Sequence, residues 1–149
     1  MLIMLAIIIL VAIDQLLKYL VSMHVKLSND ITLIPHLLDI TYVENRGAAF
    51  GMLQNYRWFF IVFAVAMISI FVYLIRRKQL THKMFLCAAT LIIGGGIGNF
   101  IDRLMLGYVV DYLKLSFFSP VCNFADYCVT IGTVILVIYV LFVHKDVKN

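Results

Sequence analysis

Four apolar stretches, each about 20 residues long, constrain the fold of this 149-residue chain more than any other feature. A helix needs about 20 mostly apolar residues to cross the roughly 30 Å hydrocarbon core of a bilayer. The stretches cover residues of about 1–22, 58–75, 84–105 and 123–143. Backbone polar groups must be paired internally in hydrocarbon, so such spans are helical. The sequence therefore predicts one domain, residues 1–149, with four transmembrane helices.

The composition agrees with a membrane protein and excludes three other classes. Hydrophobic residues make up 64% of the chain and charged residues only 13%. Soluble domains are nearer half apolar and a quarter charged, so a water-soluble globule, a disordered chain and a disulfide-stapled module are all excluded. The first stretch holds Asp14 and Lys18 and has no basic start. We therefore expect a retained span rather than a cleaved signal peptide.

Basic residues gather in two places that predict how the spans are oriented. The segment 76–83 carries four Lys or Arg and no acid, and the C-terminal tail adds two more. The six are Arg76, Arg77, Lys78, Lys83, Lys145 and Lys148. Because short loops rich in Lys and Arg stay in the cytoplasm, we expect both termini there and the loops of about 23–57 and 106–122 outside. The net charge of +4 then reports orientation, and no nucleic-acid partner is expected.

The first outer loop is long enough to have structure of its own. Residues 31–44 combine Ile, Thr, Val and Tyr around Pro35, a composition typical of short strands. Small residues follow in 46–51, where they favour a turn. Loops of this length with internal structure are usually functional, although a simple spacer is the alternative.

Four aspartates converge on the outer half of the membrane under this orientation. A helix rises 1.5 Å per residue, so Asp102 lies about 27 Å from the inner end of its span and Asp14 lies beyond the midplane of the first. Asp111 follows in the second outer loop, and Asp126 lies at the outer end of the fourth span. Charges are costly in hydrocarbon, so these groups should face partners or a wet cavity.

Spacing alone leaves several roles open for the polar residues within the spans. Asp14 and Lys18 are at i and i+4 on one helical face, so an internal ion pair is favoured over chemistry. Asn99, Asp102 and Arg103 also lie near one another, which favours a structural or substrate-orienting role. Arg103 would either anchor at the lipid headgroups or pair with an acid.

Asn123 and Asp126 repeat the Asn-x-x-Asp spacing at the start of the fourth span. From that spacing alone, capping is the favoured role, because Asn is a good N-cap and an acid in the first turn suits the helix dipole. Asp111 lies among bulky apolar residues, and its spacing supports structure and function equally.

Taken together, Asp111 and Asp126 supply the minimum for acid–base hydrolysis. Two nearby carboxyl groups cannot both ionise easily, so one of them keeps a proton. The ionised group can take a proton from water, and the protonated group can hydrogen-bond a scissile carbonyl and later protonate the leaving nitrogen. Because Asp126 opens a helix, we expect it to be ionised and Asp111 to hold the proton.

The sequence offers few residues in the patterns that metal, cofactor or phosphate sites require. The four histidines are scattered, and Cys87, Cys122 and Cys128 form no Cys-x-x-Cys pair, so neither a metal nor another cofactor is expected. We expect the three cysteines to be small buried residues, with a Cys122–Cys128 disulfide left open. In the glycine run at 94–98, Gly94 and Gly98 predict a close helix-packing face rather than a phosphate loop.

Six short blocks of sequence occur in order along nearly the whole chain. They are Asp14-Gln15 with Lys18, Asn45-Arg46-Gly47-Ala48-Ala49-Phe50-Gly51, Gly98-Asn99, Asp102-Arg103, Gly107 with Val109-Val110-Asp111, and Asn123-Phe124-Ala125-Asp126. In these blocks the chain resembles bacterial lipoprotein signal peptidase, also called signal peptidase II. Tyr112 and Cys122 stand where that family often has Phe, and neither change touches a carboxylate.

The resemblance implies an aspartyl endopeptidase of the bacterial plasma membrane, with its site near the extracytoplasmic face. Such an enzyme hydrolyses the peptide bond on the amino side of a diacylglyceryl-modified Cys in prolipoproteins. By motif match, Asp111 and Asp126 are the catalytic pair, acting with a water and no metal. The implied supporting or substrate-binding residues are Asp14, Lys18, Asn45, Arg46, Gly47, Asn99, Asp102, Arg103 and Asn123.

The expected fold is an all-α membrane protein of four transmembrane helices, with a small β-rich platform in the first extracytoplasmic loop. The implied partners are diacylglyceryl-modified prolipoproteins, membrane phospholipids and cyclic-peptide inhibitors such as globomycin, and a monomer is expected. Two other functions stay open at this point. One is a small proton-linked transporter, which should place acids on both sides of the midplane. The other is a non-catalytic assembly subunit whose acids form interhelical pairs.

Overall fold

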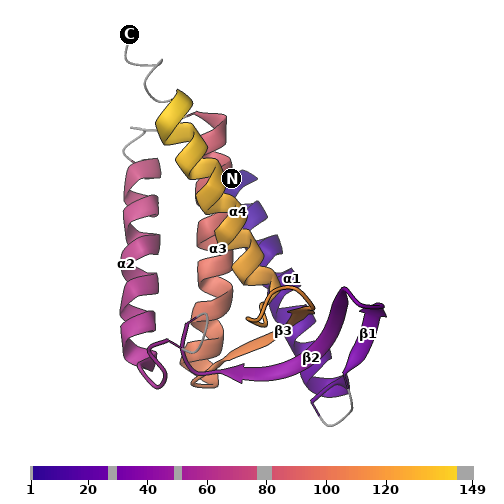
Figure 1. Ribbon diagram of the computed structural model, residues 1–149. Helices are drawn as coiled ribbons and strands as arrows, with labels where there is room; N and C mark the ends of the chain where they lie inside the picture. Colours follow the sequence, from indigo (N-terminus) through magenta and orange to yellow (C-terminus); the bar gives the residue numbers. More distant parts are fainter. Residues whose placement is uncertain (1, 27–29, 49–51, 77–81, 144–149) are drawn as a thin grey trace.

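Four long helices dominate the computed structural model, which describes residues 2–26, 30–48, 52–76 and 82–143 (Figure 1). They are α1 (Leu2–His24), α2 (Arg57–Arg76), α3 (Lys83–Met105) and α4 (Phe124–Ile138), and α4 continues into a short π-helical turn, η2 (Tyr139–Val143). Each of the four spans, the last counted as Phe124–Val143, is long and apolar enough to cross a membrane. The predicted spans are confirmed to within two residues at each end.

Helix α3 is the centre of the bundle and contacts the other three helices. Its glycines allow the close approach. A Cβ on Gly94 would lie 2.9 Å from a side-chain carbon of Leu10, and one on Gly98 would overlap the carboxylate of Asp14, both on α1. The face predicted from Gly94 and Gly98 is therefore confirmed, and it packs α1 against α3.

The outer surfaces of the bundle are apolar. Large hydrophobic side chains stay exposed along α1, α2 and α4, including Leu5, Ile9, Phe63 and Val134. In Figure 1, α2 stands beside α3 with much of its surface uncovered. Helices that expose this much apolar surface are suited to hydrocarbon rather than water. The chain is a multi-pass membrane protein.

A three-stranded antiparallel sheet lies at one end of the bundle, with the order β1 (Ile31–Ile34), β2 (Leu38–Asn45) and β3 (Val109–Leu115). The strands expected in the first loop are confirmed. Strand β3 lies within residues 106–122, for which the sequence predicts only a loop. It pairs with β2 so that Asn45 lies opposite Val109 and Val43 opposite Asp111. The second loop thus completes the platform that the first begins.

The cysteines differ in part from expectation. Cys128 is buried, but Cys122 is only partly buried and Cys87 is exposed on α3, so the expectation of three buried residues is wrong. A thiol behaves as a small apolar group, which makes an outward-facing position on a membrane helix acceptable. All three are free thiols in the structure, so the Cys122–Cys128 disulfide left open above is not formed.

Candidate active site

Asp111 and Asp126 open onto one cavity of about 510 Å³. Asp111 comes from the middle of β3 and is only 2% exposed, whereas Asp126 comes from the first turn of α4. The polar side chains of Asn45, Asn99 and Arg103 also reach this cavity. The rest of its wall is mainly apolar, including Leu115, Phe118, Val121 and Val129. The fold therefore brings both predicted carboxyl groups to one largely apolar cavity.

A capping box places Asp126. The side chain of Asn123, the N-cap of α4, accepts from the backbone N–H of Asp126 at 2.9 Å, and Oδ2 of Asp126 accepts from the backbone N–H of Asn123 at 3.1 Å. The capping role is confirmed. Asn123 is fully buried, and its Nδ2 also donates to Oδ1 of Asp111 at 2.6 Å. One side chain thus caps the helix and contacts both carboxyl-bearing residues.

Two further amides complete the connection between the carboxyl groups. Nδ2 of Asn99 donates to Oδ1 of Asp126 at 2.8 Å, and Oδ1 of Asn99 lies 3.2 Å from Nδ2 of Asn123. On the opposite side, Nδ2 of Asn45 donates to Oδ2 of Asp111 at 2.7 Å. The oxygen of Asn45 accepts from the backbone N–H of Gly47 at 2.9 Å, which fixes the direction of this amide.

Burial raises the pKa of Asp111 to about 7, and repulsion from the nearby Asp126 carboxylate adds to the rise. Hydrogen bonds from Asn45 and Asn123 act in the opposite direction, because they stabilise the ionised form. The shift is large enough that Asp111 holds a proton for part of the time at neutral pH. An acid that is protonated near pH 7 can donate a hydrogen bond or a proton.

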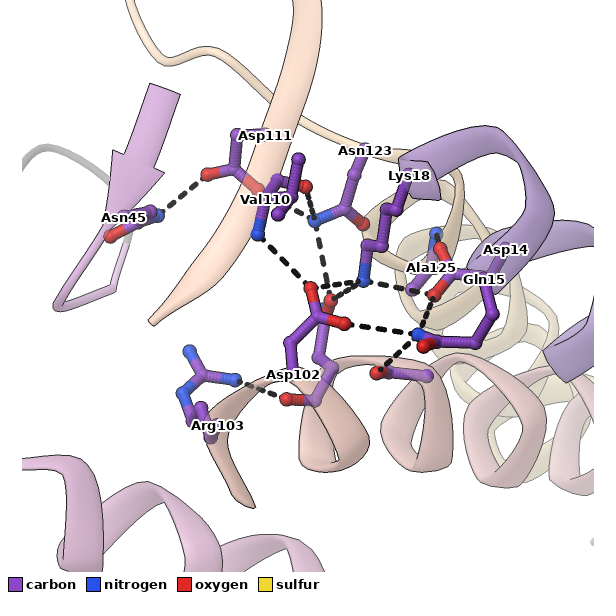
Figure 2. Close-up of polar contacts among 12 residues, drawn as sticks. Asp14, Gln15, Lys18, Asn45, Asp102, Arg103, Val110, Asp111, Asn123 and Ala125 are labelled. Carbon is purple, nitrogen blue, oxygen red and sulfur yellow. Dashed lines mark hydrogen bonds and ion pairs between the residues drawn. The ribbon is translucent and has the colours of Figure 1, made fainter. Parts of the chain in front are cut away.

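A buried ion cluster lies beside the cavity. Asp14, Lys18 and Asp102 are 1%, 3% and 3% exposed, and Nζ of Lys18 lies 2.9 Å from Asp14 and 3.0 Å from Asp102. The predicted ion pair of Asp14 and Lys18 is therefore confirmed. Figure 2 shows Lys18 pointing between the two carboxylates, with Gln15 alongside.

Gln15 belongs to this cluster, although the sequence analysis did not include it among the supporting residues. Its Nε2 lies 3.0 Å from Asp102, 3.2 Å from the carbonyl of Gly98 and 3.3 Å from Asp14. Its place next to Asp14 in a matched sequence block was the one available signal.

The two carboxylates of the cluster each hold the backbone just before a cavity aspartate. Asp14 accepts from the N–H of Ala125 at 3.0 Å, and Asp102 accepts from the N–H of Val110 at 3.0 Å (Figure 2). Ala125 precedes Asp126 and Val110 precedes Asp111. Through these two hydrogen bonds, α1 holds the start of α4 next to Asp126, and α3 holds β3 next to Asp111.

Arg103 and Gly47 line the cavity, whereas Arg46 lines a neighbouring cleft. Arg103 donates to the carbonyl of Gly47 at 3.2 Å and lies 4.5 Å from the ring centre of Phe60. Among the ion pairs of the described residues none involves Arg103, so of the two alternatives left open for this residue, pairing with an acid is not observed. Arg46 is exposed and pairs with Glu44 at 3.0 Å.

A second and more polar cleft, of about 490 Å³, lies next to the first. Glu44, Arg46 and Gln54 line it, and it shares Asn45 and Asp111 with the main cavity. Within the described part of the chain, no group of three or more His, Cys, Asp or Glu is arranged to hold a metal ion.

Comparisons with known proteins agree on one family. The model of the family described as signal peptidase (SPase) II matches residues 6–142. The lipoprotein signal peptidase of Symbiobacterium thermophilum is 38% identical over 138 residues, which cover 91% of each chain. The lipoprotein signal peptidase of Streptococcus pyogenes serotype M2 is 42% identical over 146 residues, which cover 97% of this chain and 95% of that protein.

Two solved structures are also similar over the whole fold. Both are described as bacterial membrane enzymes solved by the in meso method, one at 2.3 Å and the other at 1.9 Å resolution. The first has a TM-score of 0.88 at 33% identity and covers 99% of this chain and 90% of its own. The second has a TM-score of 0.85 at 32% identity and covers 95% and 93%.

Proposed function

The chain belongs to the signal peptidase II family, which removes signal peptides from prolipoproteins, and on that premise we propose that it is an aspartyl endopeptidase. Asp111 and Asp126 form its catalytic pair and share one proton. The observation that carries the proposal is their meeting in one cavity, from β3 and from the start of α4. The raised pKa of Asp111, to about 7, supports the assignment of the shared proton to this residue.

The reaction follows from these two protonation states. Asp126, ionised, takes a proton from a water molecule while the water oxygen attacks the scissile carbonyl carbon. Asp111, protonated, donates a hydrogen bond to the carbonyl oxygen as charge develops there. The C–N bond then breaks as Asp111 passes its proton to the leaving nitrogen, and the pair again holds one proton, the one that Asp126 took from water. The products are a signal peptide with a free carboxylate and a mature chain with a free amine.

The asparagines hold the pair in this arrangement. Asn99 and Asn123 connect the two carboxyl groups, and Asn45 donates to the far oxygen of Asp111. Amides cannot titrate in the working range, so they orient the acids without competing for the proton. We assign Asn45, Asn99 and Asn123 to positioning the pair, and Arg46, Gly47 and Arg103 to the rim where substrate enters.

The substrate we propose is a prolipoprotein whose Cys carries a diacylglyceryl group, cleaved on the amino side of that Cys. The apolar wall around Phe118, Val121 and Val129 suits acyl chains and an apolar signal helix. Such a substrate lies in the bilayer with membrane phospholipids and enters sideways. The site then lies near the extracytoplasmic face of the bacterial plasma membrane in a monomeric enzyme, and globomycin-like cyclic peptides inhibit it by occupying the pair.

The test is cleavage of a diacylglyceryl-modified precursor by the purified protein, with Asp111→Asn and Asp126→Asn beside the wild type. We expect each variant to lose activity by at least about a thousandfold and to remain in the membrane. Asp30→Asn is the matched control, because Asp30 is exposed and pairs with Lys114 at 3.2 Å, away from the cavity. Wild-type cleavage by Asp111→Asn or Asp126→Asn would refute the assignment.

The same assay tests whether a metal takes part. We expect full activity after treatment with EDTA, since proton transfer between the carboxyl groups and water needs no Lewis acid. Activity that is lost in EDTA and restored by zinc would indicate a metallopeptidase instead.

A further inference from the structure

Lys18 is buried among acceptors that use all three of its N–H bonds. Its Nζ lies 2.9 Å from Asp14, 3.0 Å from Asp102 and 2.9 Å from Oδ1 of Asn99. An ammonium group has three donors and no acceptor. The atom of Asn99 that faces Lys18 must therefore be the carbonyl oxygen, and this contact fixes the direction of the Asn99 amide.

The other end of the same amide reaches Asp126. Nδ2 of Asn99 donates to Oδ1 of Asp126 at 2.8 Å, and the second carboxylate oxygen accepts from the backbone N–H of Asn123 at 3.1 Å. Both oxygens of Asp126 thus face N–H donors. Two such hydrogen bonds favour the ionised carboxylate over the protonated acid.

We propose that Lys18 is a positioning residue that holds the N–H end of Asn99 toward Asp126 and so keeps Asp126 available as the base. The proposal deepens the function proposed above and rests on it, because it takes Asp126 as the group that deprotonates water. Without Lys18, the carboxylates of Asp14 and Asp102 attract the N–H end of the Asn99 amide. Its oxygen then faces Asp126, where it pairs best with a protonated acid that cannot act as a base.

Charged groups from each neighbouring element act on Asp126. Lys18 of α1 and Arg103 of α3 attract its negative charge, whereas Asp111 of β3 repels it. Three other titratable side chains lie within its field and are neutral near pH 7; they are Tyr112, Cys122 and Tyr127. A change at Lys18 therefore alters both an electric field and a hydrogen bond, and a test must separate the two.

A charge-balanced variant makes this separation. The cluster of Asp14, Lys18 and Asp102 contains two carboxylates and one ammonium, a formal charge of −1. Lys18→Met combined with Asp102→Asn removes one charge of each sign and leaves −1. An asparagine oxygen still accepts from the N–H of Val110, so the anchor of β3 is retained. Asp102→Asn also changes the contact with Gln15, but the single and the double variant share that change. What the double variant loses in addition is the donor that fixes Asn99.

The measurement is kcat and KM across a range of pH with the diacylglyceryl-modified precursor. We expect the acidic limb of the kcat profile of the double variant to move upward by about one pH unit or more, and KM to change less than about threefold. Asp102→Asn alone is the control. It keeps the contact of Lys18 with Asn99 and makes the cluster less negative, so its acidic limb stays in place or moves to lower pH.

A second variant covers the case in which the double variant does not fold. Asn99→Leu is close to asparagine in size, adds no charge, and removes the N–H that asparagine donates to Asp126. The proposal requires the same upward shift in this variant. A wild-type pH profile in either variant overturns it, even when stability is reduced, because Lys18 would then serve only the fold.

The variants distinguish a failure of this positioning role from a failure of the proposed function. If Asp126→Asn cleaves normally, the catalytic pair itself is wrong. If Asp126→Asn is inactive and the profiles of the Lys18 and Asn99 variants are unchanged, only the positioning role of Lys18 is refuted.

Discussion

Asp111 is the residue whose environment gives the clearest dependence on pH. Its pKa, raised to about 7 by burial and by Asp126, means that the protonated form is lost as pH rises through about 7. If this form donates to the scissile carbonyl, kcat/KM falls about tenfold per pH unit above that value. Activity that stays constant well above pH 8, about one unit beyond the limb, would contradict the role of Asp111 as the acid.

Asn45 supplies a variant with a defined sign for the same experiment. Its Nδ2 donates to Asp111 at 2.7 Å and lowers the pKa of that carboxyl. Asn45→Ala removes the donor, so the pKa of Asp111 rises and the basic limb of the profile moves to higher pH.

Asn123 combines two roles that substitution can separate. Serine can replace its oxygen as an N-cap, but not its donation to Asp111, and alanine replaces neither. We expect Asn123→Ser and Asn123→Ala to lose activity alike and to differ by about 1 kcal/mol in the free energy of unfolding, with Ser the more stable. Unfolding in mixed detergent micelles measures the difference. An Asn123→Ser enzyme with wild-type activity would reduce Asn123 to a cap.

At the scale of elements, the contact between α1 and α3 depends on Gly98 more than on Gly96. A Cβ on Gly98 would overlap the carboxylate of Asp14, which holds the N–H of Ala125. A Cβ on Gly96 would meet only Ile68, at 3.9 Å, an ordinary contact. The two positions lie on the same helix and differ in what they face.

Gly98→Ala is therefore expected to destabilise the protein by roughly 1–3 kcal/mol and to lower activity, because Asp14 must move. Gly96→Ala is the matched control and should be neutral or stabilising by up to about 1 kcal/mol, the helix propensity that alanine adds. Thermal unfolding of both variants measures the change in stability, and cleavage of the diacylglyceryl-modified precursor by each variant measures the change in activity. Equal effects at the two positions would contradict the packing argument.

Pairing of β2 with β3 is the other element-scale event that builds the site. The register places Asn45 opposite Val109 and Val43 opposite Asp111, with an irregularity between Ile40 and Val43. Through this register, the amide of Asn45 reaches Asp111 from across the sheet. The first loop contributes to the cavity only because the second loop adds a strand to it.

At the scale of the whole molecule, the distribution of Lys and Arg predicts the orientation in the membrane. The C-terminal tail and the segment 76–83 should lie in the cytoplasm, and the sheet outside. Alkaline phosphatase fused after Phe118 is expected to be active, and the same enzyme fused after Val143 inactive, because the reporter works only outside. The reverse pattern would invert the proposed topology and place the cavity on the cytoplasmic side.

The sequence by itself determined the four apolar spans, and it predicted that Asp14, Asp102, Asp111 and Asp126 lie in the same half of the membrane. Both follow from local properties. A run of consecutive apolar residues is enough to identify a span, and a fixed rise per residue is enough to give the depth of a side chain along it. The ion pair of Asp14 and Lys18 belongs here too, because both residues lie on a single helical face.

Only the tertiary structure decided how these groups are connected. Strand β3 forms only by pairing with β2. The hydrogen bond of Asn45 with Asp111 joins residues 66 positions apart, and that of Asp14 with Ala125 joins residues 111 positions apart. Such contacts depend on strand register and on the directions of donors in packed helices, and no local pattern encodes either. The sequence predicts that the acids lie toward one end of the spans, and the packing of α1, α3, α4 and β3 arranges them into a site.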